Sequence, residues 1–292
     1  MKNKLLRNGV EMPEVGFGTW KAGETDGFAV LSEAIRAGYR HIDTASAYHT
    51  EEAVGRAVAA SGVDRSEFFI TTKAWKDQLG YDRTLAAFDA SCQALGMDYL
   101  DLYLIHWPRP DAACEEWKEL DRGSWRAMEE LYRAGRVRAI GVSNFQPDRL
   151  VDLILHNEVV PAVNQVETHP FCQQTEAAAV MASEGVQIES WAPFAEGRNN
   201  LFGNGTLVSL AAKYRKSVAQ VVLRWLIQRG VVVIPKSVRP ERMAENIAVF
   251  DFHLAPEDMD LIATLDTRRS CFLSHRDPET VKWLGTMKYE MD

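Results

Sequence analysis

The sequence predicts an α/β fold: a single (β/α)8 TIM barrel over residues 1–292, with an N-terminal β-hairpin and a C-terminal tail over the barrel mouth. Two observations lead to this prediction. Short apolar segments recur along the whole chain, and helical patterns follow them. Most of these segments stay apolar until their last residues, which is typical of parallel strands buried on both faces. Eight β units that alternate with helices favour one closed barrel.

The chain begins with a hairpin signal. Asn8-Gly9 lies between two short apolar runs, and this dipeptide strongly favours a tight β-turn. The first barrel strand is expected at Val15. The other strands are expected at Tyr39–Asp43, Phe68–Lys73, Tyr99–His106, Val137–Ser143, Ala162–Val166, Val186–Trp191 and Val231–Lys236.

Helices are expected between these strands because apolar residues recur at helical spacing. The clearest faces are Leu85, Phe88, Cys92 and Leu95; Trp125, Met128, Leu131 and Tyr132; and Val218, Val221, Val222, Trp225 and Leu226. The tail from Asp266 to Asp292 is polar, and we expect it to be irregular.

A doubly wound two-domain dehydrogenase is the competing architecture, and it needs a G-x-G-x-x-G fingerprint before its first helix. Here Gly16-Phe17-Gly18 is followed by Thr19-Trp20-Lys21, so the third glycine is missing. No Pro-, Gly- or Ser-rich linker divides the sequence either. The barrel is therefore preferred.

The composition is that of an ordinary globular protein and excludes several function classes. Hydrophobic residues make up 46% and charged residues 25%, and the formal net charge is −8. This acidic balance argues against nucleic-acid binding, and no apolar run is long enough for a membrane span. Residues 1–9 do not resemble a signal peptide, so a cytoplasmic protein is expected. Neither a disulfide framework nor a metal site is expected, because no C-x-x-C pair occurs among Cys92, Cys114, Cys172 and Cys271.

Polar residues finish almost every predicted strand. In barrels of this kind the chemistry lies at the carboxyl ends of the strands. Tyr48 follows the first of these ends and lies within reach of the same mouth. The strand-end residues expected to converge there are Asp43, Lys73, His106, Ser143-Asn144, Gln165, Trp191 and Lys236-Ser237.

Four of these side chains suit proton transfer rather than nucleophilic attack. The reference pKa of tyrosine is about 10, which is high for a proton donor at neutral pH. A nearby Lys73 ammonium is expected to lower the pKa of Tyr48, with Asp43 keeping Lys73 charged and oriented. A neutral His106 would donate a hydrogen bond to a substrate oxygen.

Each of the four residues also has a plain structural interpretation. His106 suits a buried core histidine, Lys73 a solvated strand end, and Asp43 a helix cap. Tyr48 suits a packing residue. Their occurrence at four sites of one barrel face favours catalysis over these separate interpretations.

Long motifs in a fixed order extend over nearly the whole chain. They are Gly16-Phe17-Gly18-Thr19-Trp20, His41-Ile42-Asp43-Thr44-Ala45 with Tyr48, Thr72-Lys73, Leu100 to Pro108, Gly141-Val142-Ser143-Asn144-Phe145 and Ile234-Pro235-Lys236-Ser237. With these motifs the chain resembles the aldo-keto reductases, including small bacterial members of the diketogluconate-reductase type.

The resemblance implies reduction of aldehydes and ketones to alcohols by hydride transfer from NADPH. It assigns Asp43, Tyr48, Lys73 and His106 to the catalytic tetrad, with Tyr48 as general acid. The family most often has Tyr where this chain has Trp191, and either ring would stack on the nicotinamide. Further coenzyme contacts are implied for Gly18, Thr19 and Trp20, and carboxamide contacts for Ser143, Asn144 and Gln165.

A cationic cluster bears on the choice of coenzyme. Lys236, Arg239 and Arg242 lie close together in an acidic chain, and a planar Arg suits a phosphate. A solvated helix start is the plain alternative. The resemblance assigns Lys236, Ser237 and Arg242 to the 2′-phosphate of NADPH and Glu245 and Asn246 to the adenine.

Two segments leave the substrate open. After the tyrosine the family commonly has x-Asn-Glu, whereas this chain has His49-Thr50-Glu51. The polar loop 192–204, which contains Arg198, either folds over the coenzyme pyrophosphate or is plain surface. Trp20 and Trp107 are the expected substrate walls, and small aldehydes, keto acids and sugar carbonyls all remain candidates.

Other functions lack support or stay as alternatives. The segment around Ser143 lacks the last glycine of a serine-hydrolase elbow, and no H-x-x-x-H spacing suggests a zinc hydrolase. A nicotinamide-binding sensor or regulatory subunit with little turnover is the alternative, since channel-associated subunits resemble the same family. The expected partner is a small-molecule carbonyl substrate, and the chain is expected to be a monomer, with an oligomer left open.

Overall fold

The N-terminal hairpin is present in the computed structural model, which describes residues 2–24, 26–108, 116–273 and 277–286. β1 (Asn3–Leu5) pairs antiparallel with β2 (Glu11–Pro13). Gly9 has a φ of +83°, which favours glycine, and the Leu6 amide donates to the Val10 carbonyl across the turn. The predicted hairpin is confirmed.

Eight parallel strands follow the hairpin, and each pairs with its neighbour in chain order. Two hydrogen bonds join the ends of this sheet: Gly16 N donates to Val233 O at 2.8 Å, and Val233 N donates to Glu14 O at 3.0 Å. The curled sheet has the arrangement of a (β/α)8 barrel. The strands are β3 (Phe17–Gly18), β4 (His41–Asp43), β5 (Phe69–Ala74), β6 (Leu100–Ile105), β7 (Val137–Ser143), β8 (Val163–Glu167), β9 (Gln187–Trp191) and β10 (Val232–Val233).

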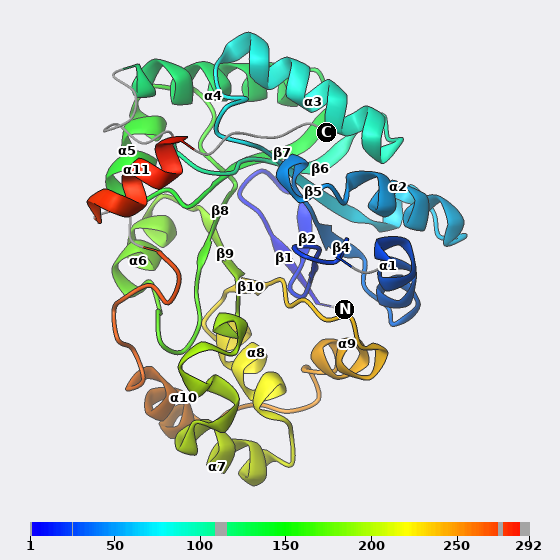
Figure 1. Ribbon diagram of the computed structural model, residues 1–292. Coiled ribbons are helices and arrows are strands. Elements are labelled where there is room, and N and C mark those ends of the chain that lie inside the picture. Colours follow the sequence, from blue (N-terminus) through cyan, green and yellow to red (C-terminus); the bar gives the residue numbers. More distant parts are fainter. Residues whose placement is uncertain (1, 25, 109–115, 274–276, 287–292) are drawn as a thin grey trace.

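The helices lie around the strands as an outer ring (Figure 1). None of them, in the part of the chain that is described, is long and apolar enough to span a bilayer. They are α1 (Gly27–Arg36), α2 (Glu51–Ala60), α3 (Tyr81–Leu95), α4 (Trp117–Arg133), α5 (Pro147–Leu155), α6 (Thr175–Ser183), α7 (Gly205–Tyr214), α8 (Val218–Gln228), α9 (Pro240–Ile247), α10 (Pro256–Ala263) and α11 (Pro278–Thr286).

The three predicted apolar faces lie on α3, α4 and α8, and local signals fix the ends of these helices. Ser217 and Gln220 form a capping box at the start of α8. Gly96 follows the last residue of α3 and caps the helix in the left-handed conformation that glycine adopts without strain. The buried face of α8 includes Val221 and Trp225, which pack into the core between the helices and the barrel.

The hairpin closes one end of the barrel. Leu6 and Met12 are buried in one apolar cluster with Leu102 and Val163 of the barrel strands. The Asn8 side chain donates to the carbonyl of Arg138, near the start of β7. Since the amino ends of the strands are covered in this way, the carboxyl ends are left for a site.

Two predicted segments differ from the structure. β10 covers Val232–Val233 and is shorter than the predicted strand Val231–Lys236. Ile234 N still donates to Ser190 O at 3.3 Å, but Pro235 has no amide hydrogen with which to continue the ladder. The prediction of an irregular tail is wrong for α11, which begins with Pro278 at its first position. Asp277 explains this helix, since its carboxylate accepts from the Thr280 amide at 2.8 Å, as an N-terminal cap does.

Candidate active site

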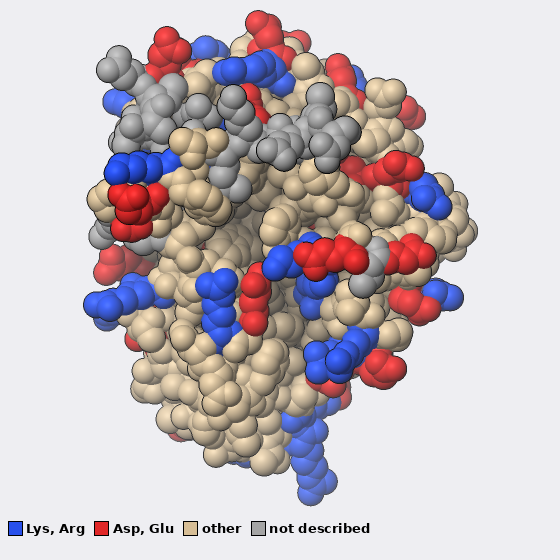
Figure 2. Space-filling view, viewed as in Figure 1, with Lys and Arg blue, Asp and Glu red and all other residues tan. Residues whose placement is uncertain are grey.

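The four predicted tetrad residues converge. Asp43 ends β4, Lys73 lies near the end of β5, and His106 directly follows β6. All three are buried, at 1%, 0% and 5% exposure. Tyr48 is half-buried at the end of a 3-10 turn (Ser46–Tyr48) that precedes α2. Seen from one side, the molecule is hollowed near the middle, and Figure 2 shows Lys, Arg, Asp and Glu side chains along the lower edge of this hollow.

Lys73 and Asp43 form a buried ion pair. Lys73 Nζ lies 2.6 Å from Asp43 Oδ1 and also donates to the carbonyl of Thr44 at 2.9 Å. Burial alone would lower the pKa of Lys73, but Asp43 and the other negative groups nearby raise it above its usual value. Lys73 therefore carries a fixed positive charge at neutral pH, as the sequence predicts.

Tyr48 lies between this ion pair and His106. Its hydroxyl oxygen is 3.2 Å from His106 Nε2, and Lys73 Nζ is 4.9 Å from the centre of its ring. Burial raises the pKa of Tyr48, and the Lys73 charge counters that rise only in part because Asp43 acts in the opposite sense. The predicted net lowering of the Tyr48 pKa is therefore wrong for this structure, although the effect of Lys73 itself has the predicted sign.

His106 is neutral, as predicted. Burial, together with the charge of Lys73, holds its pKa well below the usual value. The ring packs edge-on against Trp75, with centroids 4.9 Å apart. Its Nδ1 atom has no hydrogen-bond partner among the described residues. The Asn144 side chain donates to the His106 backbone carbonyl at 3.0 Å, which links the tetrad to the next strand.

The residues assigned to the carboxamide form a connected group on β7 and β8. Ser143 Oγ donates to the Gln165 carbonyl at 2.8 Å, and Asn144 Nδ2 donates to Ser143 Oγ at 3.1 Å. The Trp191 indole N–H donates to Asn144 Oδ1 at 2.8 Å. Tryptophan at this position thus supplies a hydrogen bond to Asn144 through its indole.

The glycine-rich segment after β2 lies beside the tetrad. A Cβ on Gly18 would come within 3.0 Å of the Ile234 carbonyl, so close strand contact explains this glycine. Trp20 is 48% exposed and its ring lies 5.0 Å from that of Tyr48. The Thr50 hydroxyl, where the family commonly has Asn, bonds to Thr19 at 3.0 Å and to Thr44 at 2.8 Å. It therefore ties the Gly18-Thr19 turn to the end of β4. Trp107 is half-buried just after His106.

A cavity of about 570 Å³ lies between the loop after β9, the start of α8 and α9. Arg239 precedes α9 and is not among the residues that line it. The Glu245 carboxylate accepts a hydrogen bond from Ser217 Oγ, which limits its freedom to bind adenine. All five residues assigned to the adenosine end line this cavity: Lys236, Ser237, Arg242, Glu245 and Asn246.

The loop after β9 is held by the tail. Arg198 Nη1 donates to the Cys271 carbonyl at 2.6 Å, and its guanidinium lies 4.2 Å from the centre of the Phe272 ring. Phe272 in turn packs edge-on against Trp191 at 5.2 Å. Arg198 thus fastens the loop to the tail in this structure.

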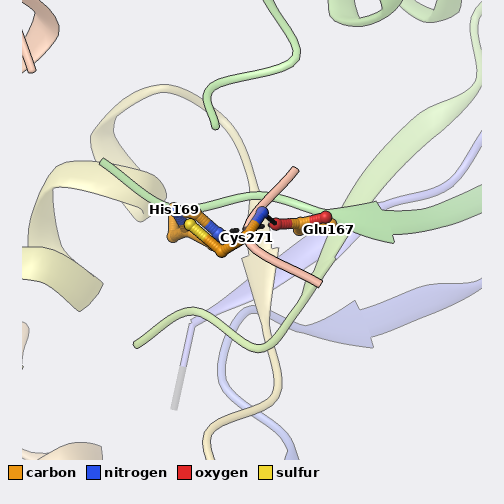
Figure 3. A group of neighbouring side chains, drawn as sticks. All are labelled: Glu167, His169 and Cys271. Atoms are coloured by element: carbon orange, nitrogen blue, oxygen red, sulfur yellow. Dashed lines mark hydrogen bonds and ion pairs between the residues drawn. The ribbon is translucent and has the colours of Figure 1, made fainter. Parts of the chain in front are cut away.

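A cluster of Glu167, His169 and Cys271 anchors the same tail segment (Figure 3). His169 Nδ1 accepts from the Phe171 amide at 3.2 Å, so Nε2 carries the ring proton and donates to Glu167 Oε1 at 2.9 Å. Glu167 also accepts from the Cys271 amide at 2.8 Å. These bonds occupy both ring nitrogens of His169 and join the tail to the end of β8.

Comparison with known proteins decides the family. The sequence profile described as "Aldo/keto reductase family" matches residues 14–267. The chain belongs to the aldo/keto reductase family. Members of this family are oxidoreductases that use nicotinamide coenzymes, so this chain is an oxidoreductase of the carbonyl-reducing class.

Individual relatives agree with this assignment. An aldo-keto reductase of Mycolicibacterium smegmatis is 47% identical, covering 96% of this chain and 98% of the relative. A glyoxal reductase of Bacillus subtilis is 48% identical, covering 89% and 91%. Among solved structures, a Bombyx mori aldo-keto reductase in complex with NADP has a TM-score of 0.84 at 36% identity, with 93% of this chain and 94% of that chain covered.

Sequence reasoning missed two polar residues behind the tetrad, Glu189 and His41. Glu189 and His41 are fully buried inside the barrel, and Gln165 connects Glu189 to Asp43. A charged residue in the middle of a predicted buried strand, as in Val186–Trp191, is the one signal that marks Glu189 in the sequence.

Proposed function

We propose that this protein reduces small aldehydes, and 2-oxoaldehydes such as glyoxal in particular, with NADPH as hydride donor and Tyr48 as general acid. The observation that carries the proposal is the approach of Tyr48 Oη to His106 Nε2, at 3.2 Å, beside the buried Lys73–Asp43 pair. The substrate class follows from the likeness to the glyoxal reductase of Bacillus subtilis.

Different side chains orient the substrate carbonyl oxygen and protonate it. With the proton of neutral His106 on Nε2, the ring donates to the substrate oxygen or to Tyr48 Oη, which leaves the phenolic proton for transfer. A nicotinamide coenzyme, when bound, would supply the hydride for the carbonyl carbon. Tyr48 then gives its proton to the oxygen as negative charge develops there, and the Lys73 charge stabilises the phenolate that remains.

The raised pKa of Tyr48 is compatible with this role. An acid must hold its proton until the oxygen becomes basic, and burial keeps Tyr48 protonated at neutral pH. Asp43 has its own part: its bond to Lys73 at 2.6 Å fixes the ammonium beside the Tyr48 ring.

The residues at both ends of the proposed coenzyme site fit NADPH. Both amide hydrogens of Asn144 are engaged, by the His106 carbonyl and Ser143 Oγ, and Asn144 Oδ1 accepts from Trp191 with one of its two lone pairs. The second lone pair of this oxygen is left to receive an N–H group of a carboxamide. Lys236 and Arg242 line the distal cavity and suit a 2′-phosphate. Gly18, Thr19 and Trp20 would border the nicotinamide ribose, and Trp191 would stack on the ring.

We also propose that the tail covers the barrel mouth and that Trp20 and Trp107 form substrate walls. The contacts of Phe272 with Trp191 and of Arg198 with Cys271 support this placement. The loop 192–204 would then lie across the coenzyme, held from outside by the tail. We further propose that residues 1–292 form a single domain.

Oxidation of NADPH and NADH by the purified protein, over a panel of glyoxal, methylglyoxal, aromatic aldehydes and aldoses, tests the function. We expect turnover with NADPH that is fastest on the 2-oxoaldehydes. Tight NADPH binding without turnover on every panel member would contradict the reductase proposal and favour the sensor. Equal rates with NADH would contradict the coenzyme choice.

A further inference from the structure

A second carboxyl group lies behind the tetrad and has no part in the proposed mechanism. Glu189 is on β9 and is fully buried inside the barrel. Its Oε2 accepts from Gln165 Nε2 at 2.8 Å, and the same Nε2 donates to Asp43 Oδ2 at 2.8 Å. Gln165 thus bridges the tetrad carboxylate and Glu189.

Both hydrogens of the Gln165 amide nitrogen are used by these two carboxyl groups. The amide oxygen is therefore the atom of this side chain that is left to accept from a ligand. Rotating the amide by half a turn would place its oxygen against two carboxyl groups and lose both hydrogen bonds. The orientation of Gln165 is consequently set by Asp43 and Glu189 together.

His41 lies against the other oxygen of Glu189. His41 Nδ1 lies 3.3 Å from the Pro13 carbonyl, which only accepts, so Nδ1 carries the ring proton. His41 Nε2 lies 3.5 Å from Glu189 Oε1, which is at the limit of hydrogen-bond distance, and both atoms are without a hydrogen-bond partner among the described residues. Because Nε2 of this tautomer only accepts, a proton on Oε1 makes the contact attractive, whereas a carboxylate would set two lone pairs against each other.

The electrostatics agree with this protonated carboxyl. Burial, with the nearby Asp43 charge, raises the pKa of Glu189 to about 8. Burial also lowers the pKa of His41 to about 3. At neutral pH the pair is therefore largely a neutral carboxylic acid and a neutral imidazole, which avoids a buried charge beside Asp43.

We propose that Glu189, supported by His41, is a positioning residue that fixes the Gln165 amide so that its oxygen receives the carboxamide of a bound nicotinamide coenzyme. The inference rests on the proposed function, because it takes Gln165 as a carboxamide contact. It adds a row of buried polar groups that runs from Pro13 of the N-terminal hairpin through His41, Glu189 and Gln165 to the coenzyme site.

Substitutions at Glu189 test this role by comparing two ligands. NADPH carries the nicotinamide, whereas 2′,5′-ADP carries only the adenosine end. In Glu189→Leu we expect the dissociation constant of NADPH to rise by about 10-fold, the loss of one oriented hydrogen bond, while that of 2′,5′-ADP stays within about 2-fold. Glu189→Asp, whose shorter side chain cannot span the same gap to Gln165, is expected to behave alike and replaces Glu189→Leu if that variant does not fold.

Glu189→Gln is the decisive conservative variant. A glutamine reproduces a protonated glutamate, since its oxygen accepts from Gln165 and its nitrogen donates to His41. We expect NADPH binding close to that of the wild type. Glu129→Leu is the matched control: it removes a carboxyl that is 4% exposed on α4 and bonds to the Glu158 and Val159 amides, far along the chain from the site residues.

The outcomes separate the inference from the function on which it rests. Unchanged NADPH affinity in Glu189→Leu and Glu189→Asp, or equal weakening of both ligands, would overturn the positioning role. A loss in Glu189→Gln as large as in Glu189→Leu would overturn it as well. If the wild type itself binds 2′,5′-ADP and NADPH equally well, the nicotinamide adds no affinity, and the carboxamide contact of the proposed function fails first.

Discussion

The two ends of the proposed coenzyme site are built differently. At the nicotinamide end, Asp43, Lys73 and Gln165 are buried and already joined by hydrogen bonds and an ion pair. At the adenosine end, Lys236 and Arg242 line a cavity and are paired with no carboxylate among the described residues. The nicotinamide end is therefore prearranged, whereas the adenosine end is open and positively charged.

We infer from this difference that the two ends have different roles. Buried, mutually oriented groups give the geometry that proton transfer requires, and they are costly to remove because their partners stay behind unpaired. Cations at a surface cavity provide affinity for a phosphate and are removed without harm to the fold. We therefore expect catalysis and stability to depend on the first end, and coenzyme choice on the second.

Tyr48→Phe should have the largest effect. Removing the general acid is expected to lower kcat by about 10²- to 10⁴-fold. NADPH binding, followed by quenching of tryptophan fluorescence, should stay close to normal because no coenzyme contact is lost. Undiminished turnover on glyoxal would remove Tyr48 as the acid.

Lys73→Met should reduce stability as well as activity. The variant leaves the Asp43 carboxylate buried without its partner, and this costs about 3–5 kcal/mol in the free energy of unfolding. Urea denaturation followed by circular dichroism measures it. Lys216→Ala, which breaks an ion pair with the exposed Asp251, is the control and should change stability little. Equal losses in the two variants would mean that the buried pair has no special structural role.

Arg242→Ala should change coenzyme preference without affecting the fold. Loss of charge-assisted hydrogen bonds to a 2′-phosphate is expected to weaken NADPH by about 10- to 100-fold and NADH by less than about 2-fold. Arg239→Ala is the matched control, because Arg239 is close in sequence but does not line the cavity. If both coenzymes weaken equally in Arg242→Ala, the assignment of this cluster to the phosphate is wrong.

Trp191→Phe should have a smaller effect. The phenyl ring keeps an aromatic face but loses the indole N–H that bonds to Asn144 Oδ1 at 2.8 Å. Since a neutral hydrogen bond contributes about 0.5–1.5 kcal/mol, NADPH affinity should fall by roughly 2- to 10-fold. Titration of the variant with NADPH measures the change, and an unaltered dissociation constant would mean that this bond does not help to hold Asn144.

The pH profile should show the smallest effect. The pKa of His106 lies well below its usual value because of burial and the Lys73 charge. The ring is thus neutral across the range where a free imidazole titrates, and kcat should show no imidazole ionisation between about pH 6 and 8. An inflection in this range that disappears in His106→Gln would contradict the neutral ring.

The barrel and the tetrad could be predicted from the sequence because both depend on local patterns. β7 has the predicted bounds Val137–Ser143, and the tetrad residues stand at strand ends with familiar motifs around them. Glu189 could not be assigned in this way, since its contacts with Gln165 and His41 cross the barrel interior. The net pKa of Tyr48 was also inaccessible, because it depends on how burial and the Asp43 charge outweigh Lys73.

A double-mutant cycle on kcat/KM for NADPH, with Tyr48→Phe, Arg242→Ala and the double variant, tests most directly whether the two ends act separately. The account predicts that the two single losses add, with a coupling energy below about 0.5 kcal/mol. A coupling of several times that size would contradict it, because the phosphate end would then also control the proton transfer.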